Sequence, residues 1–213
     1  MQQEMPLEIT TYSSQEVLPV LPLLQEWIER EFLKYPYLLV SPKGVTHPSN
    51  EHVAQEARGL VIVVKRLNEV VGVASCVPFD SEPSLQSILP IVREKRFDPS
   101  RMLYVSYCLT AEEMRSDESL IELIYQSVLE HAKKIGCNQL CFMQDLGKPD
   151  HPLKPKLFVP VEPWDSVDGF ERMEIELEMA WPTLQVDGSA KEEVHTMTFF
   201  YKVCDSYRSI APF

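Results

Sequence analysis

The segment from Met102 to Met143 constrains the fold of this chain more than any other part of the sequence. A run rich in β-branched and aromatic residues, Arg101 to Thr110, precedes an amphipathic pattern that extends from about Asp117 to Ile135. Gly136 follows as a glycine does at the end of a helix, and the next run, CNQLCFMQD, is again typical of a strand. Strand, helix and strand in this order predict one parallel βαβ unit at the centre of a sheet.

Further strands are predicted on both sides of this unit. Leu7 to Ser13 alternates weakly and predicts a first strand, and a helix is expected from about Pro22, because the prolines before it suit only a first turn. Two β-branched runs flank Leu67-Asn68-Glu69 and predict a hairpin. The run FERMEIELEMAW alternates strictly, as a half-solvated antiparallel strand does, and VHTMTFFYKV predicts the last strand. The sequence therefore predicts an α/β fold with a mixed sheet and helices on its faces.

The chain length of 213 residues predicts a single domain, residues 1–213, with two elaborations. An insert at residues 81–101 interrupts the strands and carries apolar residues for one short helix. A proline-rich excursion at residues 146–169 has no helical period and predicts an ordered, irregular segment. The polar stretch from Ser41 to Arg58 is expected to be a loop, with or without a short helix.

Charge and cysteine content narrow the classes of partner. The formal net charge is −12, which argues against nucleic acid and anionic membrane surfaces as main partners. The charge is compatible with a cationic amine substrate, although ordinary surface acidity explains it more simply. Five scattered cysteines, with no visible secretory signal and no apolar run of membrane-spanning length, predict buried thiols in a reducing cytoplasm. No ligand pattern predicts a metal site, and a homodimer is compatible with the sequence.

Four segments, taken in order, resemble the GNAT superfamily of acyl-CoA-dependent N-acetyltransferases. VIVVKRLNEVVGVASC resembles the second and third strands of that family, and VSYCLTAEEMRSDESLIELI resembles its fourth strand and the helix that holds coenzyme A. AKKIGCNQLCF resembles the lead into its fifth strand, and GFERMEIELEMAW resembles the entry to its sixth. The resemblance spans Gly59 to Val203 and, more loosely, Leu7 to Leu38. It rests on the order and spacing of the segments, because no one motif is specific.

The resemblance implies that an acetyl group moves directly from acetyl-CoA to a small-molecule or peptide amine. The cofactor would lie where the fourth and fifth strands splay apart, with its thioester carbonyl held by the backbone N–H groups of Leu109 and Thr110. Its pyrophosphate would lie against backbone N–H groups at the start of the following helix. The residues at that position are Arg115, Ser116, Asp117, Glu118, Ser119 and Leu120.

This loop departs from the family pattern, because every glycine position is filled by a residue with a side chain. Asp117 and Glu118 would each repel a diphosphate by roughly 3 kcal/mol at about 5 Å and an effective dielectric near 20, against about 0.3–1 kcal/mol from the helix dipole. The same residues suit a helix that caps itself, with Ser116 as the N-cap and the two acids in the first turn. The alternative function is therefore a GNAT-shaped binding or regulatory protein without catalytic activity.

The candidate catalytic residues are Tyr107 and Asp145. The resemblance implies a tyrosine that protonates the leaving thiolate and a carboxylate that takes the proton of the amine, and these residues lie on or at the end of the two splayed strands. Asp145 equally suits a residue that caps a turn. Cys108 is a candidate nucleophile for a hydrolase, but no histidine and aspartate partners are evident, so a buried thiol is the simpler interpretation. The insert and the excursion would flank the acceptor side and set specificity.

Overall fold

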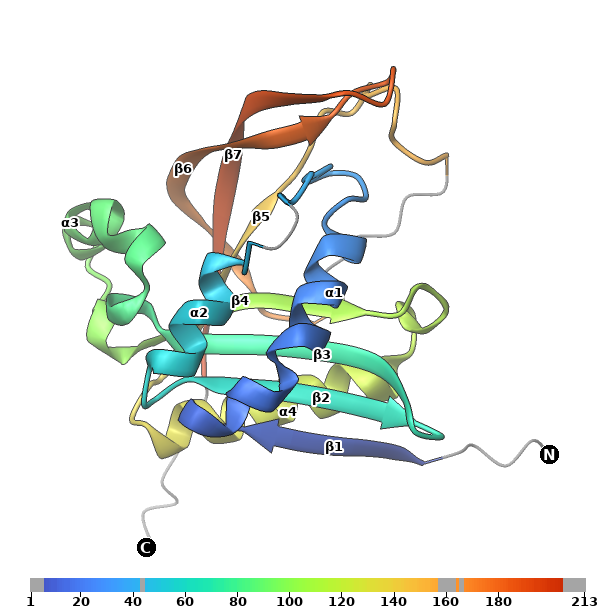
Figure 1. Ribbon diagram of the computed structural model, residues 1–213. Helices are drawn as coiled ribbons and strands as arrows, with labels where there is room; N and C mark the ends of the chain where they lie inside the picture. Colours follow the sequence, from blue (N-terminus) through green and yellow to red (C-terminus); the bar gives the residue numbers. More distant parts are fainter. Residues whose placement is uncertain (1–5, 43–44, 157–163, 165–166, 205–213) are drawn as a thin grey trace, which may run out of the picture.

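The computed structural model describes residues 6–42, 45–156, 164 and 167–204, which form a seven-stranded mixed sheet with helices on both faces (Figure 1). The strand order is β1-β2-β3-β4-β5-β7-β6. The strands are β1 (Leu7–Tyr12), β2 (Leu60–Arg66), β3 (Glu69–Pro78), β4 (Met102–Thr110), β5 (Gln139–Asp145), β6 (Glu171–Leu184) and β7 (Ala190–Val203). The predicted α/β class and mixed sheet are confirmed.

Helices cover the sheet from two sides. Figure 1 shows α1 and α2 on one face and α4 on the opposite face. The α-helices are α1 (Leu21–Glu31), α2 (Pro48–Gln55), α3 (Leu89–Glu94) and α4 (Glu118–Lys134). Shorter 3-10 segments are η1 (Ser14–Val20), η2 (Phe79–Ser81), η3 (Pro83–Ile88), η4 (Pro99–Arg101) and η5 (Glu112–Met114).

The sheet divides at the junction of β4 and β5. These strands pair in parallel at only three positions, Met102 with Gln139, Leu103 with Leu140 and Tyr104 with Cys141. Beyond that point β4 continues beside β3, whereas β5 continues beside β7. Figure 1 shows the result, because β1 to β4 lie side by side while β5 and the β6–β7 hairpin turn away from them. The parallel unit and its splay are therefore confirmed.

The helix that follows β4 approaches the sheet closely. Leu120, Ile124 and Val128 of α4 are completely buried. Opposite them on β3 is Gly72, where an added Cβ would lie 3.2 Å from Ile124 Cδ1 and 3.4 Å from Leu120 Cδ1. The missing side chain at Gly72 thus lets the first turns of α4 pack directly over β3.

Two irregularities of the backbone shape the strands. The β2–β3 hairpin turns through Leu67 and Asn68, which have φ values of 52° and 67°, as a type I′ turn requires. On β4, Tyr107 pairs with Ser75 while Val105 pairs with Cys76, so Ser106 is the extra residue of a β-bulge. The predicted hairpin is confirmed, and the bulge lies next to the place where β4 and β5 separate.

The two elaborations contain little regular structure. Residues 81–101 contain η3, α3 and η4, and residues 41–58 contain α2. The described part of residues 146–169 is irregular. All five cysteines are buried and unpaired by disulfides. Across the described residues, no helix is both long enough and apolar enough to cross a membrane, and no group of three or more His, Cys, Asp or Glu residues is arranged to hold a metal.

Candidate functional site

The gap between β4 and β5, which we call the wedge, leaves the β5-facing edge of β4 without a paired strand beyond Tyr104. Ala111 N–H donates to Val71 O on β3 at 2.9 Å. Because N–H groups alternate in direction along a strand, the N–H of Thr110 points away from β3 and toward the wedge, whereas that of Leu109 points toward β3. Of the two predicted carbonyl-binding residues, the geometry therefore favours Thr110.

The predicted pyrophosphate loop connects the end of β4 to α4, and its helix caps itself. Asp117 is the N-cap, and its Oδ1 accepts from the N–H of Leu120 at 3.1 Å. The prediction of Ser116 as N-cap is wrong by one residue, because the Asp117 side chain is the one that reaches the third N–H of the helix. The N–H groups of Glu118 and Ser119, in the first turn of α4, have no intrahelical acceptor and stay as donors at this terminus.

Arg66 changes the electrostatics expected for this loop. Its Nη2 lies 3.3 Å from Asp117 Oδ2, and its Nη1 lies 3.1 Å from Met114 Sδ. Glu118 is exposed on the helix surface. The repulsion expected from two acids is therefore reduced, because one is paired with a cation and the other is in water.

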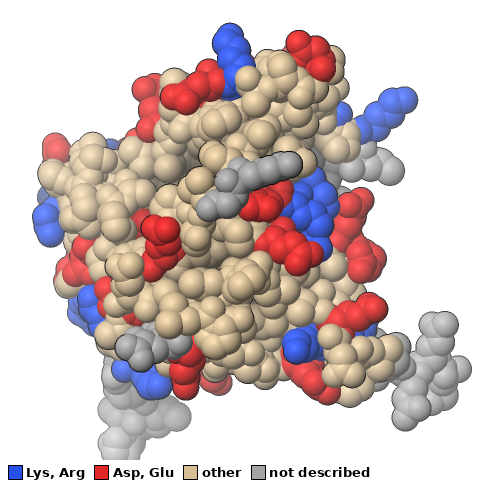
Figure 2. Space-filling model, viewed as in Figure 1, with Lys and Arg blue, Asp and Glu red and all other residues tan. Residues whose placement is uncertain are grey.

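Arg115 does not extend into solvent as a free phosphate ligand. Its Nη2 lies 2.7 Å from Oε2 of Glu31, a carboxylate in the last turn of α1 that is only 1% exposed. Arg30 and Lys34 contact the same carboxylate at 2.8 and 2.9 Å. Burial raises the pKa of Glu31, but the hydrogen bonds from Lys34 and Arg30 outweigh it, so the net shift is downward and the group stays ionised. Figure 2 shows cationic and acidic side chains intermingled on this face of the molecule.

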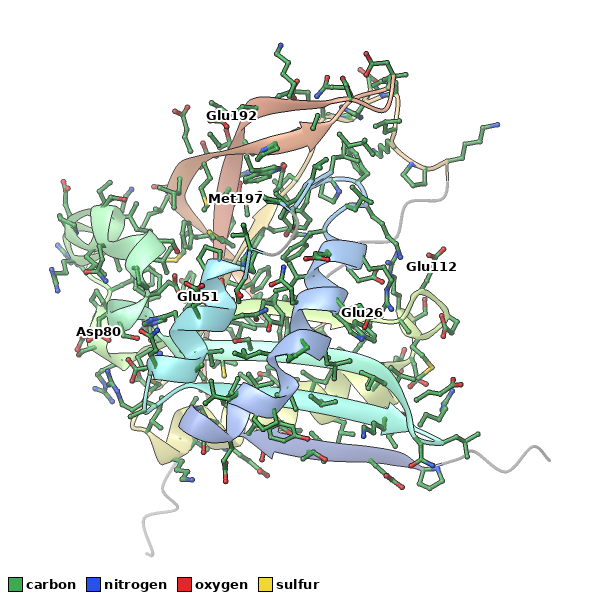
Figure 3. All side chains as sticks on the ribbon, viewed as in Figure 1. Glu26, Glu51, Asp80, Glu112, Glu192 and Met197 are labelled. Carbon is green, nitrogen blue, oxygen red and sulfur yellow. The ribbon has the colours of Figure 1, made fainter. Side chains whose placement is uncertain are left out.

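A cavity of about 300 Å³ lies beside the wedge, on the face of the sheet that α1 and α2 cover. We call it the central cavity. Its floor includes Ser106 at the β4 bulge and Met143 on β5. Met197, labelled in Figure 3, closes it from β7. Its apolar wall includes the aromatic and sulfur-containing side chains of Phe32, Tyr37, Tyr104, Met143, Met179, Trp181 and Met197. A cavity of this size and polarity suits the apolar part of a small molecule.

One carboxylate interrupts the apolar wall of the central cavity. Glu82, only 3% exposed, is the N-cap of η3, where its Oε1 accepts from the backbone N–H of Ser84 at 3.3 Å and from its hydroxyl at 2.9 Å. Among the described residues, Glu82 Oε2 has no hydrogen-bond partner, and neither has the hydroxyl of Ser106. Two residues that line this cavity therefore each carry a buried polar atom that lacks a partner among the described residues.

His47 also lines the central cavity, as the N-cap of α2. Its Nδ1 accepts from the N–H of Ser49 at 3.3 Å. Burial lowers the pKa of His47 to about 4, so the ring is neutral at pH 7. His47 therefore supplies no positive charge to balance Glu82.

A second cavity, also of about 300 Å³, lies between the end of β5 and the β6–β7 hairpin. We call it the hairpin cavity. Asp145 Oδ2 lies 2.7 Å from His195 Nδ1, and His195 Nε2 lies 2.8 Å from Thr183 Oγ1. Asp145 Oδ1 accepts from Gly147 N–H at 2.7 Å. Asp145 thus caps a turn and orients His195.

A stacked pair of rings separates the two cavities. The rings of Trp181 and His195 lie 3.7 Å apart with an interplanar angle of 13°. Trp181 lines the central cavity, and His195 lines the hairpin cavity. Trp181 Nε1 also donates to Tyr37 O at 2.9 Å, which fixes the indole against the segment after α1.

Two of the predicted reactive side chains lie in the core. Tyr107 is fully buried, and its hydroxyl donates to Asn50 Oδ1 at 2.7 Å. Burial raises the pKa of Tyr107 far above its ordinary value. Tyr107 lines neither cavity, so the structure brings it together with α2 and not with Asp145. Cys108 is 1% exposed, which agrees with the interpretation of this residue as a buried thiol.

Sequence reasoning did not single out Glu82, His195 or Thr183. Glu82 is followed by Pro83 and Ser84, and an acid before Pro-x is a common start of a short helix, so its capping role carried a local signal. No local sequence signal predicted the contact of His195 with Asp145, because this contact depends on the register between β5 and β7.

No family model matches the sequence, and no curated protein matches it. Solved structures do align with this chain over most of its length. An N-acyl amino acid synthase from uncultured soil microbes aligns with a TM-score of 0.57 at 9% identity, over 95% of this chain and 93% of that one. A putative acetyltransferase from Salmonella typhimurium, solved with its cofactor acetyl-CoA, aligns with a TM-score of 0.53 at 13% identity, over 94% and 96% of the two chains.

A CoA-dependent acyl-homoserine lactone synthase, solved with SAM and isopentyl-CoA, aligns with a TM-score of 0.51 at 16% identity, over 91% of this chain and 83% of that one. At these identities the likeness concerns the fold. The strand order, the parallel β4–β5 junction and the wedge beside α4 are the features that the chain combines. The chain therefore has the fold of the GNAT superfamily.

Proposed function

We propose that this chain is a GNAT-type N-acyltransferase that moves an acetyl group from acetyl-CoA to the amine of a small molecule or peptide. The wedge is the observation that carries the proposal. β4 and β5 separate beside the start of α4, and a small-molecule cavity lies next to the gap. An acyl donor held in the wedge would thus have an acceptor site within reach of its carbonyl.

The residues around the wedge suit coenzyme A in part. Acetyl-CoA supplies an activated thioester when it is bound. The Thr110 N–H, directed into the wedge, would donate to the thioester oxygen and stabilise the charge that develops there. The N–H groups of Glu118 and Ser119 would donate hydrogen bonds to phosphate oxygens, with Arg66 balancing Asp117. The N–H of Leu120 is already taken by Asp117, so this loop offers fewer donors than a glycine-rich one.

The first test is ligand binding followed by turnover. Acetyl-CoA should raise the melting temperature of the protein, because a ligand that binds only the folded state stabilises it by about 2.7 kcal/mol at 100 times its Kd. Release of the CoA thiol in the presence of a panel of primary amines should then identify acceptors. No melting shift at millimolar acetyl-CoA would refute the proposal and leave the non-catalytic binding protein.

A charge variant tests the role of the loop. Asp117→Asn keeps a good N-cap but removes a negative charge next to the phosphates, so acetyl-CoA should bind roughly threefold to tenfold more tightly. Glu113→Gln, at an exposed position of the same loop, is the matched control and should change the affinity little. If Asp117→Asn binds no more tightly than the control, the phosphates do not lie at the start of α4.

A further inference from the structure

We propose that the central cavity recognises a primary amine with an apolar body, and that Glu82 binds its ammonium group. This inference rests on the proposed function and names the acceptor class for the same site. The sequence predicted that residues 81–101 would flank the acceptor side, and Glu82 lies at the start of that insert.

The hydrogen bonds of the Glu82 carboxylate are incomplete. A carboxylate has two oxygens that accept up to about four hydrogen bonds. Glu82 Oε1 binds the N–H and hydroxyl of Ser84, but Oε2 is buried without a partner among the described residues. Leaving a buried charge unpaired is costly, so a site built in this way favours a ligand that supplies the missing donor.

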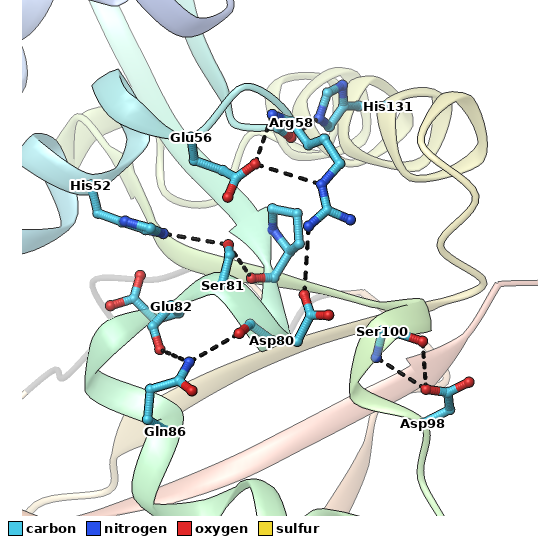
Figure 4. A network of polar contacts seen from close by, with 11 residues as sticks. His52, Glu56, Arg58, Asp80, Ser81, Glu82, Gln86, Asp98, Ser100 and His131 are labelled. Atoms are coloured by element: carbon cyan, nitrogen blue, oxygen red, sulfur yellow. Dashed lines mark hydrogen bonds and ion pairs between the residues drawn. The ribbon is translucent and has the colours of Figure 1, made fainter.

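The protein's own cations do not supply that donor in the described part of the cavity wall. No described Lys or Arg lines the central cavity, and His47, which does, is neutral at pH 7. Arg58, a cation on the same side of the molecule, lies 3.5 Å from Glu56 Oε1 and 3.7 Å from Asp80 Oδ1. Figure 4 shows Arg58 joined to Glu56 and Asp80, whereas the contact drawn for Glu82 is its backbone carbonyl, which accepts from Gln86 Nε2 at 3.1 Å.

The remainder of the cavity wall defines the body of the ligand. Tyr104, Trp181 and three methionines surround a space of about 300 Å³, which suits a hydrocarbon or aromatic group. The only other buried polar atom without a partner in this wall, within the described residues, is the Ser106 hydroxyl at the β4 bulge. A ligand with one cationic end and one apolar end therefore matches this wall.

The Glu82 carboxylate also discriminates between two possible occupants of the central cavity, the acyl chain of the donor and an amine. An acyl chain of the donor would fit the apolar wall, but it carries no positive charge and would leave Glu82 Oε2 unpaired. An ammonium group satisfies Oε2 with a charge-assisted hydrogen bond. The amine is therefore the occupant that the whole wall favours.

The experiment measures amine binding in the absence of any acyl-CoA. By isothermal titration calorimetry at pH 7, 2-phenylethylamine should bind at least tenfold more tightly than 2-phenylethanol, which has the same shape and no charge. Glu82→Gln should bind the amine at least tenfold more weakly than the wild type and lose the preference over the alcohol. Glu51→Gln, at an exposed position of α2 labelled in Figure 3, is the control and should keep the wild-type preference.

Several outcomes would overturn the inference. Equal affinity of the wild type for amine and alcohol would do so without any variant, which covers a Glu82→Gln protein that fails to fold. An equal loss in Glu51→Gln would assign the effect to surface charge. Competition with the amine by octanoyl-CoA but not by acetyl-CoA would show that the cavity holds the acyl chain.

Amine recognition and the proposed acetyl transfer can be refuted independently of each other. Binding of the amine through Glu82 without acetyl transfer would refute the transferase and leave amine recognition standing. Acetylation of apolar amines with the same KM in the wild type and in Glu82→Gln would refute the recognition and leave the transferase standing.

Discussion

In the hairpin cavity three polar side chains bind one another, whereas in the central cavity two buried polar atoms lack a partner among the described residues. Asp145, His195 and Thr183 form a continuous chain of contacts of 2.7 and 2.8 Å. Glu82 Oε2 and the Ser106 hydroxyl have no such contacts. The β6–β7 hairpin therefore borders one region whose polar groups satisfy each other and one whose polar groups do not, with the stacked rings of Trp181 and His195 between them.

The largest expected effect comes from breaking the hairpin network. Asp145→Ala removes two buried hydrogen bonds to a carboxylate, from His195 and from the N–H of Gly147, so the free energy of unfolding should fall by about 3–5 kcal/mol. Asp187→Ala is the matched control, because Asp187 makes the same kind of turn contact, with Ser189, on the surface. It should lower the free energy of unfolding much less, because the contacts of Asp187 are in solvent. Urea unfolding measures both, and equal losses would show that the network is not structural.

A pH effect of intermediate size should arise in the central cavity. The pKa of His47 falls from 6.5 to about 4 on folding, so the unfolded chain binds a proton more readily. The stabilisation from a neutral His47 is complete above pH 6.5 and is lost as the pH falls toward 4, by about 3 kcal/mol. Burial lowers the pKa of His131 as well, so the wild-type curve contains both contributions.

The variant His47→Asn isolates the contribution of His47 to the pH dependence of the unfolding free energy. Asparagine also serves as an N-cap, and it does not titrate. Relative to the wild type at pH 8, where both side chains are neutral, the variant should lose less stability between pH 6.5 and 4. Parallel curves of unfolding free energy against pH would contradict the assignment to His47.

The smallest effects compare two hydroxyl groups. Thr183→Val removes a hydroxyl that contacts His195 and donates to Trp181 O, so it should cost about 1–2 kcal/mol. Ser106→Ala removes a buried hydroxyl that has no described partner, and should be neutral or slightly stabilising. Thermal unfolding of the two variants measures the difference, and a cost for Ser106→Ala as large as that for Thr183→Val would show that Ser106 has a structural partner.

The fold was predictable wherever the signal was local. The β2–β3 hairpin followed from two β-branched runs around Leu67 and Asn68, and α4 followed from a stripe of apolar residues that ends before Gly136. The N-cap of α4 was predicted one residue too early, because Ser116 and Asp117 are both good caps and only the backbone decides which side chain reaches the third N–H.

The candidate site was less predictable, because it depends on contacts between distant segments. Thr110 could be placed from the end of a strand, but the direction of its N–H required the register with β3. Tyr107 lies one position beyond the bulge and points into the core beneath α2, which no alternation pattern reveals. The absence of a described partner for Glu82 Oε2 likewise depends on how distant segments pack around this side chain, which no local pattern reveals.

The ion pair between Arg115 and Glu31 joins the segment before α4 to the last turn of α1. Lys34 adds a second link, because its Nζ contacts both Glu31 and Glu112. Gln25, between one and two turns earlier on α1, lines the central cavity. Under the proposed function, one set of ion pairs would therefore tie the loop that holds the donor to the helix that borders the acceptor.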